Sequence, residues 1–270
     1  MLLSPAAGAL ARACHPGPTA AVTTIAILLG VSAGLDANGL ALVAATVLVG
    51  QLSIGWSNDW WDAAHDAEAG RRDKPAAQGY IAASTLRTAA FAAGAVAVPL
   101  SLLAGWVGAW HVLLLASGWV YNVALKPTPW SPLPYLVGFA ALPLYVVGVA
   151  GVDAAWWLGV AGGLLGAAAH FANAAPDVVQ DRAAGVLGLP QRLGARPSVA
   201  LALVLLGAAG TLLLAHLDLE GWAHLVALAA VLLPLIAGSA LVATDRMGRP
   251  VFTLVMLAAV GDVALLAVAA

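Results

Sequence analysis

Charged residues are scarce in this chain, and that scarcity excludes an ordinary soluble domain. Only 9% of the 270 residues are Asp, Glu, Lys or Arg, whereas 62% are hydrophobic. A typical soluble domain carries about 25% charged residues. Apolar runs of roughly 17–25 residues recur along the whole length, as expected of helices that cross a bilayer. The composition therefore predicts an all-α, polytopic membrane protein.

Cysteine and basic tracts are almost missing as well. Cys14 is the single cysteine, so the chain has neither a disulfide framework nor a cysteine metal site. The formal net charge of -2 is uninformative about nucleic acid, but no basic tract occurs, so we expect no nucleic-acid partner. Residues 1–22 lack the charged start and cleavage site of a signal peptide, so we expect a cytoplasmic lead-in there.

Nine membrane spans are expected, forming a single domain over residues 1–270 with an apolar central cavity. The apolar runs define the spans, and Pro, Gly, Asn and Asp mark most of the gaps between them. The spans fall at 18–35, 39–57, 82–104, 106–124, 132–151, 155–175, 198–215, 222–243 and 251–269.

The distribution of charge predicts how these spans are oriented. With nine spans, all 11 Lys and Arg residues fall on the side of the amino terminus. The opposite loops contain Asp36, Asp153, Asp218 and Glu220 but neither Lys nor Arg. By the positive-inside rule the side rich in Lys and Arg is cytoplasmic. We therefore expect an integral protein of a bacterial cytoplasmic membrane with its amino terminus inside.

Acidic residues gather in two motifs of equal spacing, residues 58–79 (motif one) and residues 173–194 (motif two). Six positions recur at a constant offset of 115 residues, which predicts an internal duplication. With nine spans, both motifs also lie on the cytoplasmic face. The matching positions are Asn58, Asp62, Asp66, Gly70, Pro75 and Gly79 in motif one, and Asn173, Asp177, Asp181, Gly185, Pro190 and Gly194 in motif two.

The spacing within each motif indicates a metal site. On a helix, at about 100° per residue, Asn58, Asp62 and Asp66 fall on one face. Carboxylate and amide oxygens are ligands that Mg2+ prefers, usually together with substrate phosphates. Arg71 and Lys74 follow within reach of an anion. Two such clusters above an apolar chamber predict a site where an isoprenyl diphosphate loses pyrophosphate and leaves an allylic carbocation.

Three stretches resemble a known family. NDWWDAAHDAEAGRRDKP resembles the first signature of the UbiA superfamily of intramembrane prenyltransferases, and DVVQDRAAGVLGLPQRLG resembles the second. YNVALK, residues 121–126, resembles the Tyr-x3/4-Lys element of that family. The proline-rich segment KPTPWSP that follows leaves the placement of Lys126 open. The resemblance extends over nearly the whole chain, because span count, motif order and spacing all agree.

The resemblance implies roles for individual residues. Asp59 would orient an acceptor or take its proton, and Lys126 and Tyr121 would also act in catalysis. The acceptor implied is a lipophilic or aromatic small molecule. The implied metal ligands are Asn58, Asp62, Asp66, Asp177 and Asp181. The implied diphosphate-binding residues are Arg71, Lys74, Lys126, Asn122, Asn173 and Arg182.

Simpler interpretations exist for several of these residues. The acidic groups could be solvated helix ends, and topology alone accounts for Arg72 and Arg87. Trp60 and Trp61 could line the cavity or belong to an interfacial belt. Two histidines lie within expected spans, His111 and His170, where each either lines the chamber or bonds to a neighbouring helix. The sequence offers no partner for Asp262.

Three functions are consistent with the pattern. The leading one is a prenyltransferase that joins the prenyl group to an acceptor. A terpene cyclase would use the same ionisation without an acceptor. A secondary transporter would share internal repeats and intramembrane polar groups, but transporter sites lie near the bilayer midplane, whereas these motifs lie at one mouth. The sequence determines neither the prenyl chain length, nor the acceptor, nor the oligomeric state.

Overall fold

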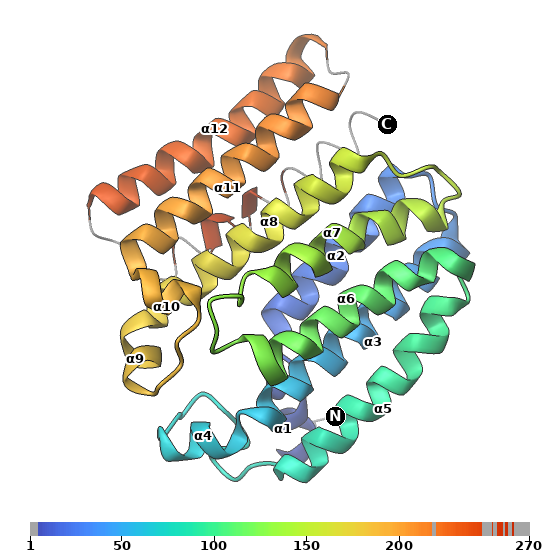
Figure 1. Cartoon of the computed structure of the whole chain (residues 1–270). Coiled ribbons are helices and arrows are strands. Elements are labelled where there is room, and N and C mark those ends of the chain that lie inside the picture. Colours follow the sequence, from blue (N-terminus) through green and yellow to red (C-terminus); the bar gives the residue numbers. More distant parts are fainter. Residues whose placement is uncertain are drawn as a thin grey trace.

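The structure, a computed structural model, describes residues 5–217 and 220–244 and a few positions of the last segment, namely 250, 253–255, 257, 258 and 261. Its regular elements are helices (Figure 1). They are α1 (Pro5–Ala13), α2 (Pro16–Ser32), α3 (Ala37–Trp61), α4 (Ala63–Glu68), α5 (Ala83–Leu102), α6 (Gly108–Val120), α7 (Leu133–Val149), α8 (Trp156–Ala174), α9 (Val178–Ala183), α10 (Leu189–Leu193), α11 (Ala195–His216) and α12 (Gly221–Ala243), with single turns η1 (Gly105–Val107), η2 (Tyr121–Leu125) and η3 (Ala175–Asp177).

Eight of the nine predicted spans correspond to described helices. Six described helices are long and apolar enough to cross a membrane, or seven if α1 and α2, bent by 60° at their junction, form one span. α7 is shorter, with 17 residues. The ninth predicted span, 251–269, and Asp262 lie largely outside the described residues. The count of nine and the side of the amino terminus therefore stay predictions.

Neighbouring helices in the sequence also pack together in space (Figure 1). α3 lies against α2, α5 and α6; α7 packs on α6 and α8; α11 packs on α8 and α12. Small residues allow the closest approaches, as in helix pairs within membranes generally. A Cβ on Gly162 would lie 2.4 Å from the Phe139 carbonyl oxygen, and one on Gly166 would lie 2.7 Å from that of Tyr135. The spacing of Gly162 and Gly166 thus brings α8 directly onto α7.

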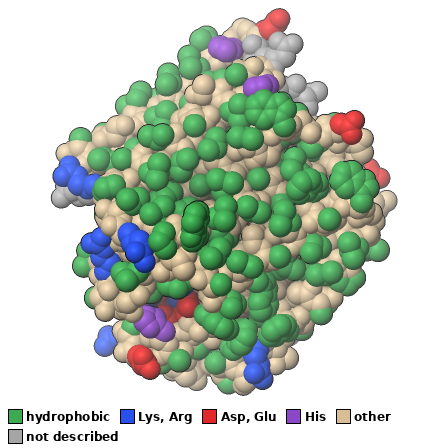
Figure 2. All heavy atoms as spheres, viewed as in Figure 1, with side chains coloured by type: hydrophobic (Ala, Val, Ile, Leu, Met, Phe, Trp, Pro, Cys, Tyr) green, Lys and Arg blue, Asp and Glu red, His purple; other side chains and the backbone are tan. Residues whose placement is uncertain are grey.

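The surface separates apolar and charged residues as a membrane protein requires. Apolar side chains cover most of the face in Figure 2. The Lys and Arg side chains visible there lie towards the end of the molecule that carries α4, α9, α10 and the start of α5, while acidic and histidine side chains occur at both ends. This distribution agrees with the charge bias in the sequence, and it identifies the end at which the chemistry is expected.

Candidate functional site

Motif one does not form one continuous helix. α3 ends at Trp61 and α4 begins at Ala63, with Asp62 (φ -83°, ψ -6°) between them. The backbone bonds still connect successive turns, because Asp62 N–H donates to Asn58 O at 3.0 Å and Asp66 N–H donates to Asp62 O at 2.8 Å. The expected single helical face is therefore bent at Asp62, while the order of the three oxygen ligands along the chain is retained.

Motif two repeats the local backbone of motif one. α9 (178–183) has the bounds of α4 (63–68) shifted by 115 residues. Gly70 and Gly185 both have left-handed φ, 65° and 82°, a conformation that favours glycine. The Arg71 N–H to Asp66 O bond of 3.0 Å has its counterpart in the bond of 2.9 Å from Val186 N–H to Asp181 O. The two motifs thus share one turn as well as one residue pattern.

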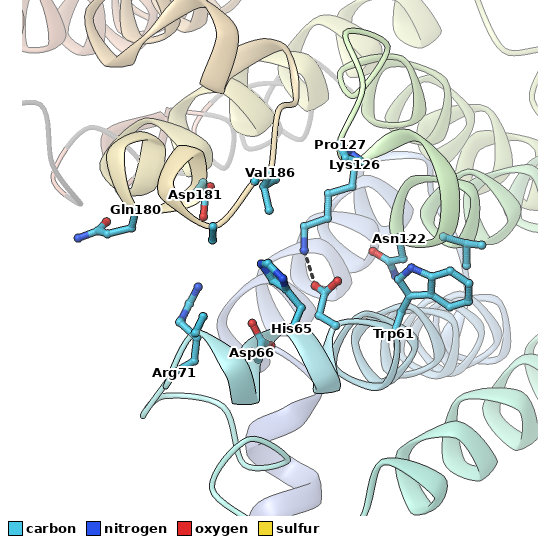
Figure 3. A pocket seen from close by; sticks show the side chains of 15 residues that line it. Trp61, His65, Asp66, Arg71, Asn122, Lys126, Pro127, Gln180, Asp181 and Val186 are labelled. Atoms are coloured by element: carbon cyan, nitrogen blue, oxygen red, sulfur yellow. Dashed lines mark hydrogen bonds and ion pairs between the residues drawn. The ribbon is translucent and has the colours of Figure 1, made fainter.

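Both motifs contribute to one cavity, shown in Figure 3. The cavity has a volume of about 480 Å³ and lies between α4, α9 and the end of η2. Several residues predicted to act together come together here. Those lining the cavity are Asp62, Asp66 and Arg71 from motif one, Asp181 from motif two, and Asn122 and Lys126 from η2 and its end.

A π-helical turn places Lys126 at this cavity. At the end of η2, Lys126 N–H donates a hydrogen bond of 2.9 Å to Tyr121 O. Donor and acceptor are five positions apart, rather than the four of an α-helix. π-turns of this kind often occur at functional sites. The Lys126 ammonium donates a hydrogen bond to the Asp62 carboxylate (Figure 3). The prolines after Lys126 therefore do not remove it from the site.

The proline-rich loop is fixed by motif two. The Ser131 hydroxyl lies 3.1 Å from His170 Nε2 and accepts a bond of 3.0 Å from Leu189 N–H. A Cβ on Gly188 would lie only 2.7 Å from the Lys126 carbonyl oxygen. The segment that closes motif two therefore packs directly on the loop that begins with Lys126.

Asn122 connects η2 to motif one. Its side chain is buried, and its Oδ1 accepts a bond of 3.2 Å from the Asn58 amide. The Asn122 amide in turn donates to the Ser57 hydroxyl at 2.8 Å and to Ile54 O at 3.0 Å. These bonds hold η2, at the end of α6, against the end of α3, so Asn58 is bonded to a residue, Asn122, that lines the cavity.

The charges around the cavity shift one another's titration. Burial raises the pKa of Asp66 above its usual range, and the nearby Asp62 carboxylate adds to the effect. The bond from Arg71 lowers the pKa of Asp73 to about 2. The same bond raises the pKa of Arg71, and the charges of Asp66 and Asp177 act in the same direction. Asp177 therefore belongs electrostatically to the group around the cavity.

Two residues predicted for the site, Asp59 and Lys74, lie beside the cavity without lining it. Asp59 is 2% exposed, and its Oδ1 accepts a bond of 2.6 Å from the Lys74 ammonium. His15 joins them, with Nε2 at 2.9 Å from the same oxygen. Sequence reasoning misses His15, because 44 residues separate it from Asp59 and no periodicity links the two.

Other predicted residues contact neighbours instead of the cavity. The Tyr121 ring packs edge-on against Tyr135 at 5.0 Å between centroids and against His170 at 5.7 Å. Arg182 donates to the carbonyl oxygens of Gln191 and Arg192, which closes the loop of motif two. Asn173 and Asp177 are exposed. The roles predicted for these residues stay predictions.

The two tryptophans of motif one separate. Trp61 lines the cavity. Trp60 packs against Phe91 and Trp119, with ring centroids 5.8 and 6.4 Å away. The Trp119 indole donates to the Ser53 hydroxyl at 3.1 Å. Of the two, Trp61 is therefore the one that can contact a molecule bound in the cavity.

His111 lies away from the cavity. It is fully buried, and Nδ1 is 2.7 Å from the Ser101 hydroxyl on α5. Eleven residues of helix, about 16 Å along the axis, separate it from Asn122. Its Nε2, the Thr46 hydroxyl and the Tyr145 hydroxyl make no hydrogen bond within the described part of the chain. The contact with Ser101 is the one expected if His111 bonds to a neighbouring helix.

The acidic side chains are spread around the cavity. Within the described residues, no group of three His, Cys, Asp or Glu side chains is close enough to hold a metal ion by itself. Asp62 bonds to Lys126, and Asp181 accepts a bond of 2.8 Å from Gln191. The possible metal ligands that face the cavity are mainly carboxylate oxygens. They suit a hard cation that takes its remaining ligands from phosphate and water.

Comparison with known proteins gives a family and a fold. A profile of the UbiA prenyltransferase family matches residues 19–261. A search of curated proteins finds no match. A UbiA homologue from Archaeoglobus fulgidus, solved with GPP and Mg2+, has a TM-score of 0.72 at 13% identity and covers 96% of this chain and 99% of its own.

Two further solved structures have the same fold. A ligand-free UbiA homologue from Aeropyrum pernix K1 has a TM-score of 0.69 at 19% identity, covering 93% of this chain and 98% of its own. A digeranylgeranylglyceryl phosphate synthase has a TM-score of 0.68 at 17% identity, covering 98% of each chain. At these identities the likeness concerns the fold alone.

Proposed function

Because the chain belongs to the UbiA prenyltransferase family, we propose that it is a Mg2+-dependent intramembrane enzyme that transfers the prenyl group of an isoprenyl diphosphate to a lipophilic or aromatic acceptor. The observation that best supports this proposal is the cavity to which both acidic motifs contribute, with Asp62 and Asp66 from one and Asp181 from the other. Arg71 and Lys126 face the same space. Homologues from Archaeoglobus fulgidus were solved with GPP or DMAPP together with Mg2+.

The carboxylates at the cavity are suitable ligands for magnesium. Mg2+ usually takes one or two carboxylates, with substrate phosphates and waters completing the octahedron. Asp62, Asp66 and Asp181 can supply the carboxylates without forming a complete cage. When bound, the metal would neutralise negative charge that develops on the departing pyrophosphate.

Binding of the diphosphate requires an exchange of partners. Lys126 is bonded to Asp62, and Arg71 to Asp73. We assign both cations to the diphosphate, so that Lys126 moves its hydrogen bond from Asp62 to a phosphate oxygen. That exchange frees Asp62 as a ligand. Until a substrate arrives, each of these two cations is paired with a carboxylate of the protein.

The reaction then proceeds by ionisation and capture. The bond between the allylic carbon and the phosphate oxygen breaks, and both electrons leave with pyrophosphate. The aromatic face of Trp61 can stabilise the resulting cation. A nucleophilic atom of the acceptor forms the new bond and releases a proton. Asp59 is not among the residues that line the cavity, so its contacts support a role in positioning Lys74 more than contact with the acceptor.

A product assay tests this function. The purified protein would be incubated in liposomes with Mg2+ and prenyl diphosphates of increasing chain length, with and without aromatic acceptors, and the products identified by mass spectrometry. We expect a prenylated acceptor and pyrophosphate, both lost on addition of EDTA. A cyclic hydrocarbon formed without acceptor would assign the cyclase reaction instead. The absence of any Mg2+-dependent pyrophosphate release would overturn the proposal.

A further inference from the structure

The junction between α1 and α2 brings a residue of the amino-terminal region into contact with motif one. His15 Nε2 lies 2.9 Å from Asp59 Oδ1 and 3.2 Å from the Lys74 ammonium. Lys74 itself lies 2.6 Å from the same Asp59 oxygen. The three side chains therefore meet around one oxygen atom. That oxygen belongs to a side chain that is 2% exposed, so water competes little for these contacts.

The backbone at this junction is built for close approach. His15 has φ 56° and ψ 65°, a left-handed conformation that is uncommon for residues other than glycine. A Cβ on Gly55 would lie 2.4 Å from the Cys14 carbonyl oxygen, so only glycine lets the junction rest on α3. The Thr19 hydroxyl donates to the same oxygen at 2.8 Å. The junction is thus held where the His15 side chain reaches Asp59.

The shared oxygen also defines how the three groups bond. A carboxylate only accepts and an ammonium only donates. Nε2 cannot donate to Asp59 and accept from Lys74 at the same time. With the proton on Nε2, Asp59 receives two hydrogen bonds; with the proton on Nδ1, the lone pair of Nε2 faces that of Asp59 at 2.9 Å. The first arrangement is favoured, and His15 then shares Asp59 with Lys74.

The bond to Asp59 leaves part of the hydrogen-bonding capacity of Lys74 unused. Its ammonium has three N–H donors, and the bond to Asp59 uses one. Its charge also acts on Asp66, which lines the cavity. Lys74 is therefore fixed close to the cavity, and it keeps N–H donors beyond the one that bonds to Asp59.

We propose that His15 is a positioning residue, which fixes the Asp59–Lys74 pair so that the Lys74 ammonium can bind the diphosphate. This inference rests on the proposed function of the cavity. It assigns the amino-terminal junction to the substrate site. A purely structural junction would need the backbone of residue 15 but not its side chain.

Substitution by glycine separates these two cases. His15→Gly removes the imidazole but suits the left-handed backbone. We expect the variant to fold, to show about a tenfold rise in KM for the prenyl diphosphate (about 1.4 kcal/mol), and to keep a nearly unchanged kcat. His15→Gln, whose amide can donate to Asp59, should recover part of the loss. His224→Ala, an exposed histidine on α12, serves as the control and should behave as wild type.

Two further measurements make the test independent of turnover. Magnesium pyrophosphate should raise the thermal midpoint of the wild type more than that of His15→Gly. In a Lys74→Met background, His15→Gly should produce no further rise in KM, because both changes remove the same interaction. Should the glycine variant not fold, His15→Asn also tolerates left-handed φ and has a side chain too short to reach Asp59.

Different results would overturn the role of His15 and the proposed enzyme function. Wild-type KM and pyrophosphate response in His15→Gly would overturn the inference and leave the enzyme assignment intact. Effects of His15→Gly and Lys74→Met that multiply independently would also overturn it. A wild-type protein without Mg2+-dependent pyrophosphate release would overturn both.

Discussion

The cations of the candidate site are each held by a carboxylate. Lys126 bonds to Asp62, Lys74 to Asp59 and Arg71 to Asp73. Removing one member of a buried pair leaves the other without compensation, which is costly. The Arg71–Asp73 pair is exposed, whereas Asp59 in its pair with Lys74 is buried. Substitutions at the Asp59–Lys74 pair should therefore affect stability and substrate binding together, and their effects should not add independently.

Two adjacent arginines provide a matched comparison at this scale. Arg71 lines the cavity, whereas Arg72 is exposed and outside it. We expect Arg71→Ala to lower kcat/KM by about 10² or more, the usual range for removing one group that stabilises developing negative charge. Arg72→Ala should stay within about twofold of wild type, as expected of a residue that only marks topology. Steady-state kinetics on both variants checks this, and equal losses would contradict the assignment of Arg71.

Asp66 should show the conflict between stability and function. Because burial raises its pKa, its ionised form destabilises the folded protein at neutral pH. Protonation of Asp66 favours the folded state. This contribution to the free energy of unfolding is fully present below the usual carboxyl range, about pH 4, and is lost as pH rises through the raised pKa. In EDTA at pH 7, Asp66→Asn should therefore have a higher thermal midpoint than wild type, while losing turnover in Mg2+.

The pH dependence of that difference is its check. The gap in thermal midpoint between Asp66→Asn and wild type should narrow as the pH falls towards the carboxyl range, since the wild-type residue becomes neutral there. A gap of constant size, or a less stable variant at pH 7, would show that the raised pKa is not the cause.

At the scale of elements, glycines decide how closely the helices approach. Gly55 lets the junction of α1 and α2 rest on α3, and Gly166 lets α8 rest on α7. In a bilayer, helices gain little from burying apolar surface, so close packing contributes much of the stability. The packing at the end of α3 therefore depends on the missing side chain of Gly55 as well as on the motif that follows.

Replacement of Gly55 tests this packing. Gly55→Ala would force the Cys14 backbone away from α3, and we expect a loss of about 1–3 kcal/mol in stability. Because His15 would move with it, KM for the prenyl diphosphate should also rise. Gly17→Ala in the first turn of α2, where no atom lies within 4 Å of the new Cβ, is the control and should be neutral or slightly stabilising. Thermal unfolding in detergent and steady-state kinetics measure both effects, and equal behaviour of the two variants would refute the packing argument.

At the scale of the whole molecule, the repeated turns of the two motifs meet across one cavity. The Lys and Arg side chains visible in Figure 2 gather towards the same end. That arrangement concentrates the charge of a weakly charged chain where a diphosphate would bind. The rest of the bundle remains apolar, as a prenyl chain and a surrounding bilayer both require.

Cysteine labelling tests the predicted orientation. In a Cys14→Ser background, Glu68→Cys lies at the motif end and Asp153→Cys at the opposite end, both exposed. With the amino terminus inside, a membrane-impermeant maleimide should label Asp153→Cys in intact cells and Glu68→Cys only after permeabilisation. The reverse pattern would place the cavity on the outer face.

The sequence by itself determined the features that depend on composition and local periodicity. Few charges and long apolar runs established the helical membrane fold. The 115-residue repeat located both motifs, and α4 and α9 have matching bounds because similar sequences favour similar turns. The carboxylate and amide side chains of both motifs indicated a hard cation, since that preference depends on residue type alone.

Only the tertiary structure decided which side chains meet. Lys126 and Asp62 are 64 residues apart, and His15 and Asp59 are 44 apart. No repeat or helical periodicity in the sequence connects residues at these separations. The π-turn at Tyr121 and the close approach at Gly55 place these groups. Contacts of this kind depend on how whole helices pack, because a shift of one helical turn would give each charge a different partner.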